Sequence, residues 1–183
     1  MAAKSKITLP QLEKAMASTT HTVRYDAMLE FARSDISPDA TPILLAALKD
    51  SYSGVVGTAV PCLGQIGPAA KNYGTPQLDI PQVVWDLIAA AKQIDRFSGL
   101  PGHYPKCVEA LVKIAPECDL VVGLIHDQIG LTNWHHLKAS LQALKTIGTE
   151  ESIDLLKRAV EFWAPELDKK ELRIAREIVE GKR

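Results

Sequence analysis

Two neighbouring histidines, His135 and His136, have the side chains in this sequence that most suggest metal chemistry, because imidazole is a common metal ligand. Adjacent residues on a helix point about 100° apart, so the two rings cannot easily bind one ion together. No histidine or cysteine stands four positions from either residue, as a helical metal pair would require. The sequence therefore predicts no metal site, and we expect no cofactor.

The three cysteines and the His126-Asp127 dipeptide do not form a recognisable nucleophile and base. Cys62, Cys107 and Cys118 are odd in number and show no C-x-x-C spacing. Two of them fall in helical apolar patterns, which is typical of buried free thiols in a reducing compartment. The sequence also lacks the G-x-S-x-G pattern and the glycine-rich phosphate loop. We expect no catalytic residues, and a protein that is not an enzyme.

The charge balance and the hydrophobic pattern argue against two classes of partner. Lysine and arginine number 21 against 22 acidic residues, whereas binding to a phosphate backbone needs a basic surplus. No run of about 18 apolar residues occurs, and residues 1–7 contain no apolar stretch of the kind found in a signal peptide. We therefore expect a cytoplasmic protein with neither a membrane nor a nucleic acid as its partner.

A segment that occurs four times indicates which elements position these residues. Its copies lie at residues 23–31, 55–67, 107–114 and 140–148. The copies align on four small residues that are 32, 48 and 33 positions apart, namely Ala27, Ala59, Cys107 and Ser140. Two of these spacings match a helical-repeat period, and the long one implies an insertion of about 15 residues. Proline, glycine and aromatic residues place loop insertions around 70–80 and 96–105.

Hydrophobic periodicity predicts about ten helices and no strand, in a single domain that covers residues 1–183. Residues suited to begin helices are Thr8, Asn133 and Thr149, and Gly148 is suited to end one. Pro61 lies inside a predicted helix and either kinks it or divides it. The predicted helices are 9–18, 22–33, 38–49, 53–66, 80–95, 104–115, 117–128, 133–147, 150–163 and 167–181.

The second copy resembles the repeat of HEAT proteins, especially the short form also found in phycobilisome lyases. The resemblance lies in Val55-Val56-Gly57-Thr58-Ala59 followed by Leu63-Gly64-Gln65-Ile66-Gly67, with Leu44 to Asp50 upstream. It covers about residues 20–165 and is weaker at the first and third copies. It implies an all-α superhelix, a right-handed solenoid whose second helices line the concave side. It implies no chemistry.

In each repeat, a helical wheel of the second predicted helix separates an apolar arc from an outward-facing side. The resemblance to HEAT repeats implies that the outward-facing sides of these helices line one groove. Trp85 lies off the arc of its helix, which suits a binding anchor because tryptophan is enriched among interface hot spots. Two alternatives stay open: an ordinary solvated face, and a Trp85 that packs beneath Tyr73 or Phe97. The residues expected to bind are Lys49, Asp50, Trp85, Lys92, His126, Asp127, Lys157 and Glu161.

Enzymes built on related scaffolds are the alternative function. A bilin lyase-like activity follows only from the repeat resemblance, since no residue identifies a bilin site. A HEAT-like DNA glycosylase uses a basic concave face, aromatic residues and an acid, a set that Lys49, Trp85, Lys92 and Asp127 partly imitate. The balanced charge argues against that activity.

The last predicted helix, 167–181, has one apolar side and alternating charges elsewhere, as expected of the terminal element of a stack. A dimerisation helix is the other interpretation, so both a monomer and a homodimer remain open. We predict a non-enzymatic helical-repeat scaffold that binds a protein partner through its concave face.

Overall fold

The computed structural model describes residues 7–72, 81–93, 102–129 and 133–181, and every regular element in these ranges is helical. The all-α class is confirmed. The α-helices are α1 (Leu9–Met16), α2 (His21–Phe31), α3 (Thr41–Ala47), α4 (Ser53–Ile66), α5 (Gln82–Ala91), α6 (Tyr104–Ile114), α7 (Asp119–Ile129), α8 (Trp134–Ile147), α9 (Glu150–Trp163) and α10 (Lys169–Val179). Two 3₁₀ helices, η1 (Pro38–Ala40) and η2 (Gly67–Asn72), precede α3 and follow α4.

Side chains cap the backbone at two of the predicted helix starts. Asn133 accepts a hydrogen bond from the amide of His136, and Thr149 accepts one from the amide of Ser152. Gly148 has a φ of 70°, the left-handed conformation that glycine adopts readily at the end of a helix. Most of both predicted loop insertions, around 70–80 and 96–105, lies outside the described residues.

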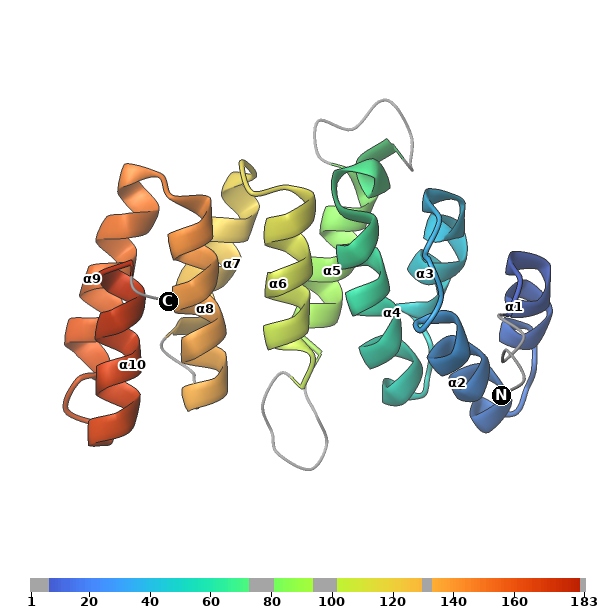
Figure 1. Ribbon diagram of the computed structural model, residues 1–183, viewed down its shortest axis with the longest axis horizontal. Coiled ribbons are helices and arrows are strands. Elements are labelled where there is room, and N and C mark those ends of the chain that lie inside the picture. The colour runs from blue at the N-terminus through green and yellow to red at the C-terminus, as the bar shows by residue number, and fades with distance from the viewer. Residues whose placement is uncertain (1–6, 73–80, 94–101, 130–132, 182–183) are drawn as a thin grey trace, which may run out of the picture.

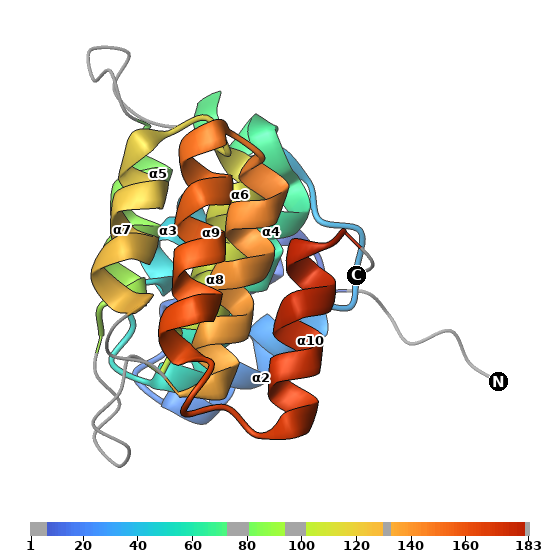
Figure 2. The same cartoon turned by 90° about the vertical axis from the view of Figure 1, so that its left-hand side faces the viewer.

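The helices lie side by side in two layers along the long axis of the molecule (Figure 1). The first-helix layer contains α2, α4, α6, α8 and α10, and the second-helix layer contains α1, α3, α5, α7 and α9. The chain alternates between the layers, and in the end-on view α3, α5 and α7 lie to the left of α4, α6 and α10 (Figure 2). Within the first-helix layer, α2 packs on α4, α4 on α6, α6 on α8, and α8 on α10.

The four small residues on which the repeat copies align occupy equivalent places in the structure. Ala27, Ala59, Cys107 and Ser140 lie in α2, α4, α6 and α8, and all four are buried. The copies therefore share a position in the first-helix layer as well as a sequence pattern.

Helix α4 runs through Pro61 without a break. Proline has no amide hydrogen, so the carbonyl of Gly57, four residues earlier, lacks its usual intrahelical donor. The Nζ atom of Lys106, on α6, donates a hydrogen bond to that carbonyl oxygen at 3.0 Å. One turn past the proline, a Cβ atom on Gly64 would lie 3.2 Å from the Cα atom of Ala110. Helices α4 and α6 therefore approach each other closely at two places.

A buried polar contact joins α6 to α8. The hydroxyl of Ser140 donates to the carbonyl of His136 at 3.0 Å, which leaves the Tyr104 hydroxyl to donate to the Ser140 oxygen at 2.8 Å. Burial raises the pKa of Tyr104 to about 12, so the phenol keeps its proton. The ring of His136 lies 5.2 Å from that of Tyr104, centroid to centroid. His136 thus belongs to the core.

Candidate protein-binding surfaces

The second-helix layer carries the surface that the sequence analysis predicts as a binding face. Of the eight predicted residues, the following seven are exposed: Lys49, Trp85, Lys92, His126, Asp127, Lys157 and Glu161. They come from α5, α7 and α9 and from the ends of α3 and α5. We call the exposed side of this layer the second-helix surface.

Asp50 differs from the other seven because a long-range ion pair holds it. Its two carboxylate oxygens accept hydrogen bonds from Nε and Nη2 of Arg24, at 2.6 and 2.7 Å. The amide of Tyr52 donates to the same carboxylate at 2.8 Å. Only 6% of the Asp50 side chain is exposed, so it ties α2 to the end of α3 and is largely closed to a partner.

The Arg24 guanidinium holds the pKa of Asp50 below its usual range, chiefly through the hydrogen bonds between them. Arg24 also donates from Nη1 to the carbonyl of Ser18 at 2.9 Å. One arginine therefore links the connection between α1 and α2 to the connection between α3 and α4.

Trp85 projects from α5 with 45% of its surface exposed, whereas Val84, Leu87 and Ile88 of the same helix are buried in the core. The prediction that it lies off the apolar arc is confirmed. Tyr73 and Phe97, its proposed packing partners, lie outside the described residues. Beside it, Lys49 and Asp86 form an ion pair at 3.5 Å that connects the end of α3 with α5.

The other two tryptophans differ from Trp85 in their surroundings. Trp134 and Trp163 are half-buried and pack against the core. The indole nitrogen of Trp163 donates to the carbonyl of Ile129 at 2.9 Å. This bond joins α9 to the end of α7.

A cleft of about 520 Å³ lies between α7 and α9 on the second-helix surface. Gly123 and His126 line it from α7, and Leu155 and Arg158 line it from α9. Near the end of α9, Phe162 is 70% exposed, which the sequence analysis missed.

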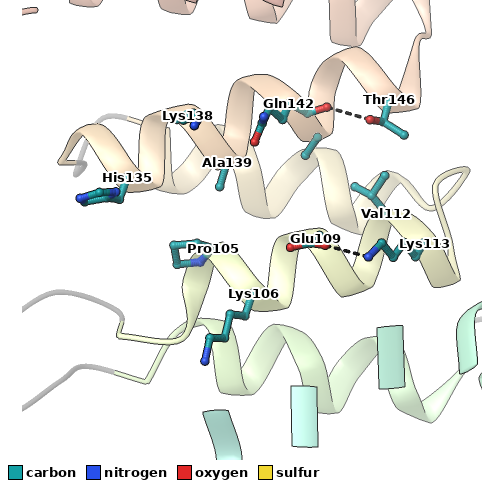
Figure 3. A pocket seen from close by; sticks show the side chains of 11 residues that line it. Pro105, Lys106, Glu109, Val112, Lys113, His135, Lys138, Ala139, Gln142 and Thr146 are labelled. Carbon is teal, nitrogen blue, oxygen red and sulfur yellow. Dashed lines mark hydrogen bonds and ion pairs between the residues drawn. The ribbon is translucent and has the colours of Figure 1, made fainter. Parts of the chain in front are cut away.

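A second concavity, of about 330 Å³, lies in the first-helix layer between α6 and α8 (Figure 3). We call it the α6–α8 groove. Its apolar lining comes from Pro105, Val112, Ala139 and Ala143. Its polar lining comes from Lys106, Glu109, Lys113, His135, Lys138, Gln142 and Thr146. The sequence analysis did not identify this groove, because its residues belong to two helices whose contact is not visible in either repeat copy.

Two of the cysteine thiols and one histidine have pKa values that burial shifts. Burial raises the pKa of Cys62 to about 11 and that of Cys107 to about 12, so both thiols are protonated at neutral pH. Burial also lowers the pKa of His136, with a smaller contribution from His135. Within residues 7–72, 81–93, 102–129 and 133–181, no group of three or more histidine, cysteine or acidic side chains could hold a metal ion.

None of the helices in the described part of the chain has the length and apolar character needed to cross a membrane. A comparison with protein-family models finds no match for this chain. A comparison with curated proteins finds none either.

Proposed function

We propose that the chain is a HEAT-like helical-repeat scaffold without catalytic activity, and that it binds a protein partner through the second-helix surface. Three observations support a solenoid as the architecture: the four aligned copies, the alternation of helices between two layers, and the packing of each first-layer helix on the next. The right-handed form is what the resemblance to HEAT repeats implies. Stacked helix pairs of this size commonly present one long layer surface to a partner.

The exposure of Trp85 is the observation that carries the proposal. A partner that covers the open 45% of this side chain removes on the order of 100 Å² of apolar surface from water. At about 25 cal/mol per Å², that burial contributes about 2–3 kcal/mol, the size expected of a hot-spot residue. No other single exposed side chain of the second-helix surface combines this area with a position on the middle helices of the layer, among the residues that the structure describes.

The charges of the second-helix surface indicate what kind of partner fits. Lys49, Lys92 and Lys157 lie on the same layer as Asp127 and Glu161, and all five are exposed. Such a mixture complements a protein surface that carries both signs, and it repels neither. A polyanion such as nucleic acid would meet the carboxylates as well as the lysines, which disfavours it.

The test is a photo-crosslinking amino acid at Ala89, an exposed position of α5 one turn beyond Trp85. A protein captured in cells is then purified, and its dissociation constant is measured directly. Trp85→Ala combined with Lys92→Glu should raise that constant about 30-fold or more, because it removes an apolar anchor and reverses a neighbouring charge.

The matched control is Val23→Ala combined with Lys170→Glu, which also removes an exposed apolar group and reverses a lysine, but in the first-helix layer. This control should leave the dissociation constant within about twofold. Equal affinity of the wild type and the Trp85→Ala, Lys92→Glu variant would reject the second-helix surface as the binding site.

A further inference from the structure

The α6–α8 groove combines an apolar floor with a basic rim on the layer opposite the second-helix surface. Val112 is almost fully buried at the floor, and Ala139 and Ala143 line it from α8. The side chains of both alanines are small, so the floor leaves room for an aliphatic group from a binding partner. In Figure 3 the polar side chains of α6 and α8 flank this floor along the length of the two helices.

The positive charges of the rim exceed the negative ones. Lys113 and Lys138 lie on opposite walls of the groove, and Glu109 is the carboxylate that lines it. Lys106 is turned toward α4, where it binds the carbonyl of Gly57, so its charge acts from the edge of the groove (Figure 3). A ligand in the groove therefore meets two ammonium groups directly and a third nearby.

Lys113 already has a partner, but a weak one. Its Nζ atom lies 2.7 Å from Oε1 of Glu109, one turn earlier on the same helix. Both side chains are more than half exposed, and ion pairs of this kind contribute little in water. An incoming carboxylate can therefore compete for Lys113 at small cost, and the ammonium group has three hydrogens to donate.

These features select one class of occupant. A nucleic acid would bring phosphates close to Glu109 and would find no phenylalanine, tyrosine or tryptophan in the groove on which to stack its bases. A peptide segment that alternates carboxylates with aliphatic side chains satisfies both the rim and the floor. Its charge complements the lysines, and its apolar side chains cover Val112 and the two alanines.

We propose that the α6–α8 groove binds an acidic peptide segment of a partner protein. An aliphatic side chain of the segment lies against Val112, Ala139 and Ala143, and its carboxylates lie beside Lys113 and Lys138. This site is separate from the second-helix surface, so the scaffold has two binding faces, one on each layer.

The test begins with a display library of random 12-residue peptides, selected on the full-length protein. The enriched peptides should contain Asp or Glu together with Leu, Ile or Val. The best peptide is then synthesised with a fluorophore, and its binding is measured by anisotropy at about 150 mM salt. Lys113→Glu combined with Lys138→Glu should weaken binding at least about tenfold, through repulsion of the peptide carboxylates.

Two further variants sharpen the result. Glu109→Gln should tighten binding about two- to fivefold, because it removes the like charge and frees Lys113. Lys92→Glu combined with Lys157→Glu, the matched double reversal on the second-helix surface, should leave affinity within about twofold. Circular dichroism checks that each variant is folded. Lys113→Gln combined with Lys138→Gln is a milder version of the double charge reversal, because it removes the two positive charges without adding negative ones.

Three outcomes would overturn the proposal. The first is a selection that yields no peptides, or yields neutral or basic ones. The second is an acidic peptide whose affinity is unchanged by the Lys113 and Lys138 reversals. The third is a single-stranded oligonucleotide that competes with the peptide and shows the same dependence on both lysines, which would make the groove a nucleic-acid site.

Discussion

Lys106 and Pro61 lie on different helices but both affect one carbonyl oxygen, that of Gly57. Pro61 cannot donate a hydrogen bond to it, and Lys106 does. Proline inside a helix normally leaves such an oxygen without its intrahelical donor. Here the next first-layer helix supplies the missing hydrogen. The local defect in α4 thereby becomes a contact that positions α6.

A double-mutant cycle tests this contact. Lys106→Met should lower the free energy of unfolding by about 1 kcal/mol, because it leaves the Gly57 carbonyl without a donor. In a Pro61→Ala background the same change should cost much less, since the new residue has an amide hydrogen for that carbonyl. Urea denaturation of the four proteins gives the coupling energy. Additive effects, within about 0.3 kcal/mol, would contradict the shared-oxygen account.

Because of the Arg24–Asp50 ion pair, we expect the stability of the folded protein to fall at acid pH. Arg24 lowers the pKa of Asp50 in the folded state, so the unfolded chain binds a proton at a higher pH than the native protein does. The stabilisation is fully present above the ordinary aspartate pKa of about 4 and is lost as the pH falls through the lower folded-state value.

Asp50→Asn should therefore be less stable than the wild type at pH 7, and its stability should fall less steeply below about pH 4. Urea unfolding between about pH 2.5 and pH 7 measures both effects. Asp26→Asn, an exposed aspartate on the same helix as Arg24, is the control and should keep the acid slope of the wild type. Parallel slopes for the wild type and Asp50→Asn would exclude this role.

At the scale of single residues, the sequence predicts the exposure of a side chain when that exposure depends only on the residue's own helix. Trp85 is off the apolar arc of its own helix, and the wheel alone places it at the surface. Asp50 looks equally available on its wheel, but its partner Arg24 comes 26 positions earlier and belongs to another helix. Pairings of this kind depend on the tertiary packing, which no local pattern contains.

At the scale of helices, the ends are predictable where neighbouring residues determine them. Helices α4 and α9 begin and end as predicted, and Thr149 caps α9. The predicted helix 38–49 is instead divided into η1 and α3, each with a proline in its first turn. Proline is tolerated at the start of a helix, so two such starts in succession favour two short elements over one.

The glycines of two helices should respond to substitution in opposite directions. Gly123 of α7 has nothing within 4 Å of an added Cβ, so Gly123→Ala should stabilise the protein by about 0.5–1 kcal/mol through helix propensity. At Gly64 the added Cβ would lie 3.2 Å from Ala110, so Gly64→Ala should destabilise by about 1–3 kcal/mol by forcing α4 from α6. Urea unfolding measures both, and changes of the same sign would refute the close approach.

At the scale of the whole molecule, hydrophobic periodicity predicts the all-α class and about ten helices, and the described residues form ten α-helices. The four small residues on which the copies align are all buried in the structure. The α6–α8 groove was not predictable in the same way, because Lys113 and Lys138 are 25 positions apart and meet only when α6 packs on α8. The spacing of the copies predicts which helices are equivalent. It does not predict which side chains lie together between neighbouring helices.

The arrangement in a row has a mechanical consequence, because α1 and α10 lie at opposite ends of it (Figure 1). When the chain is stretched from its two termini, the tension falls on helices that are held mainly by their immediate neighbours. Optical tweezers should then record several small ruptures, each releasing about 12 nm of contour for a unit of about 33 residues. Under force, such a protein unfolds in stages, and it can refold from a partly unfolded state when the force is released.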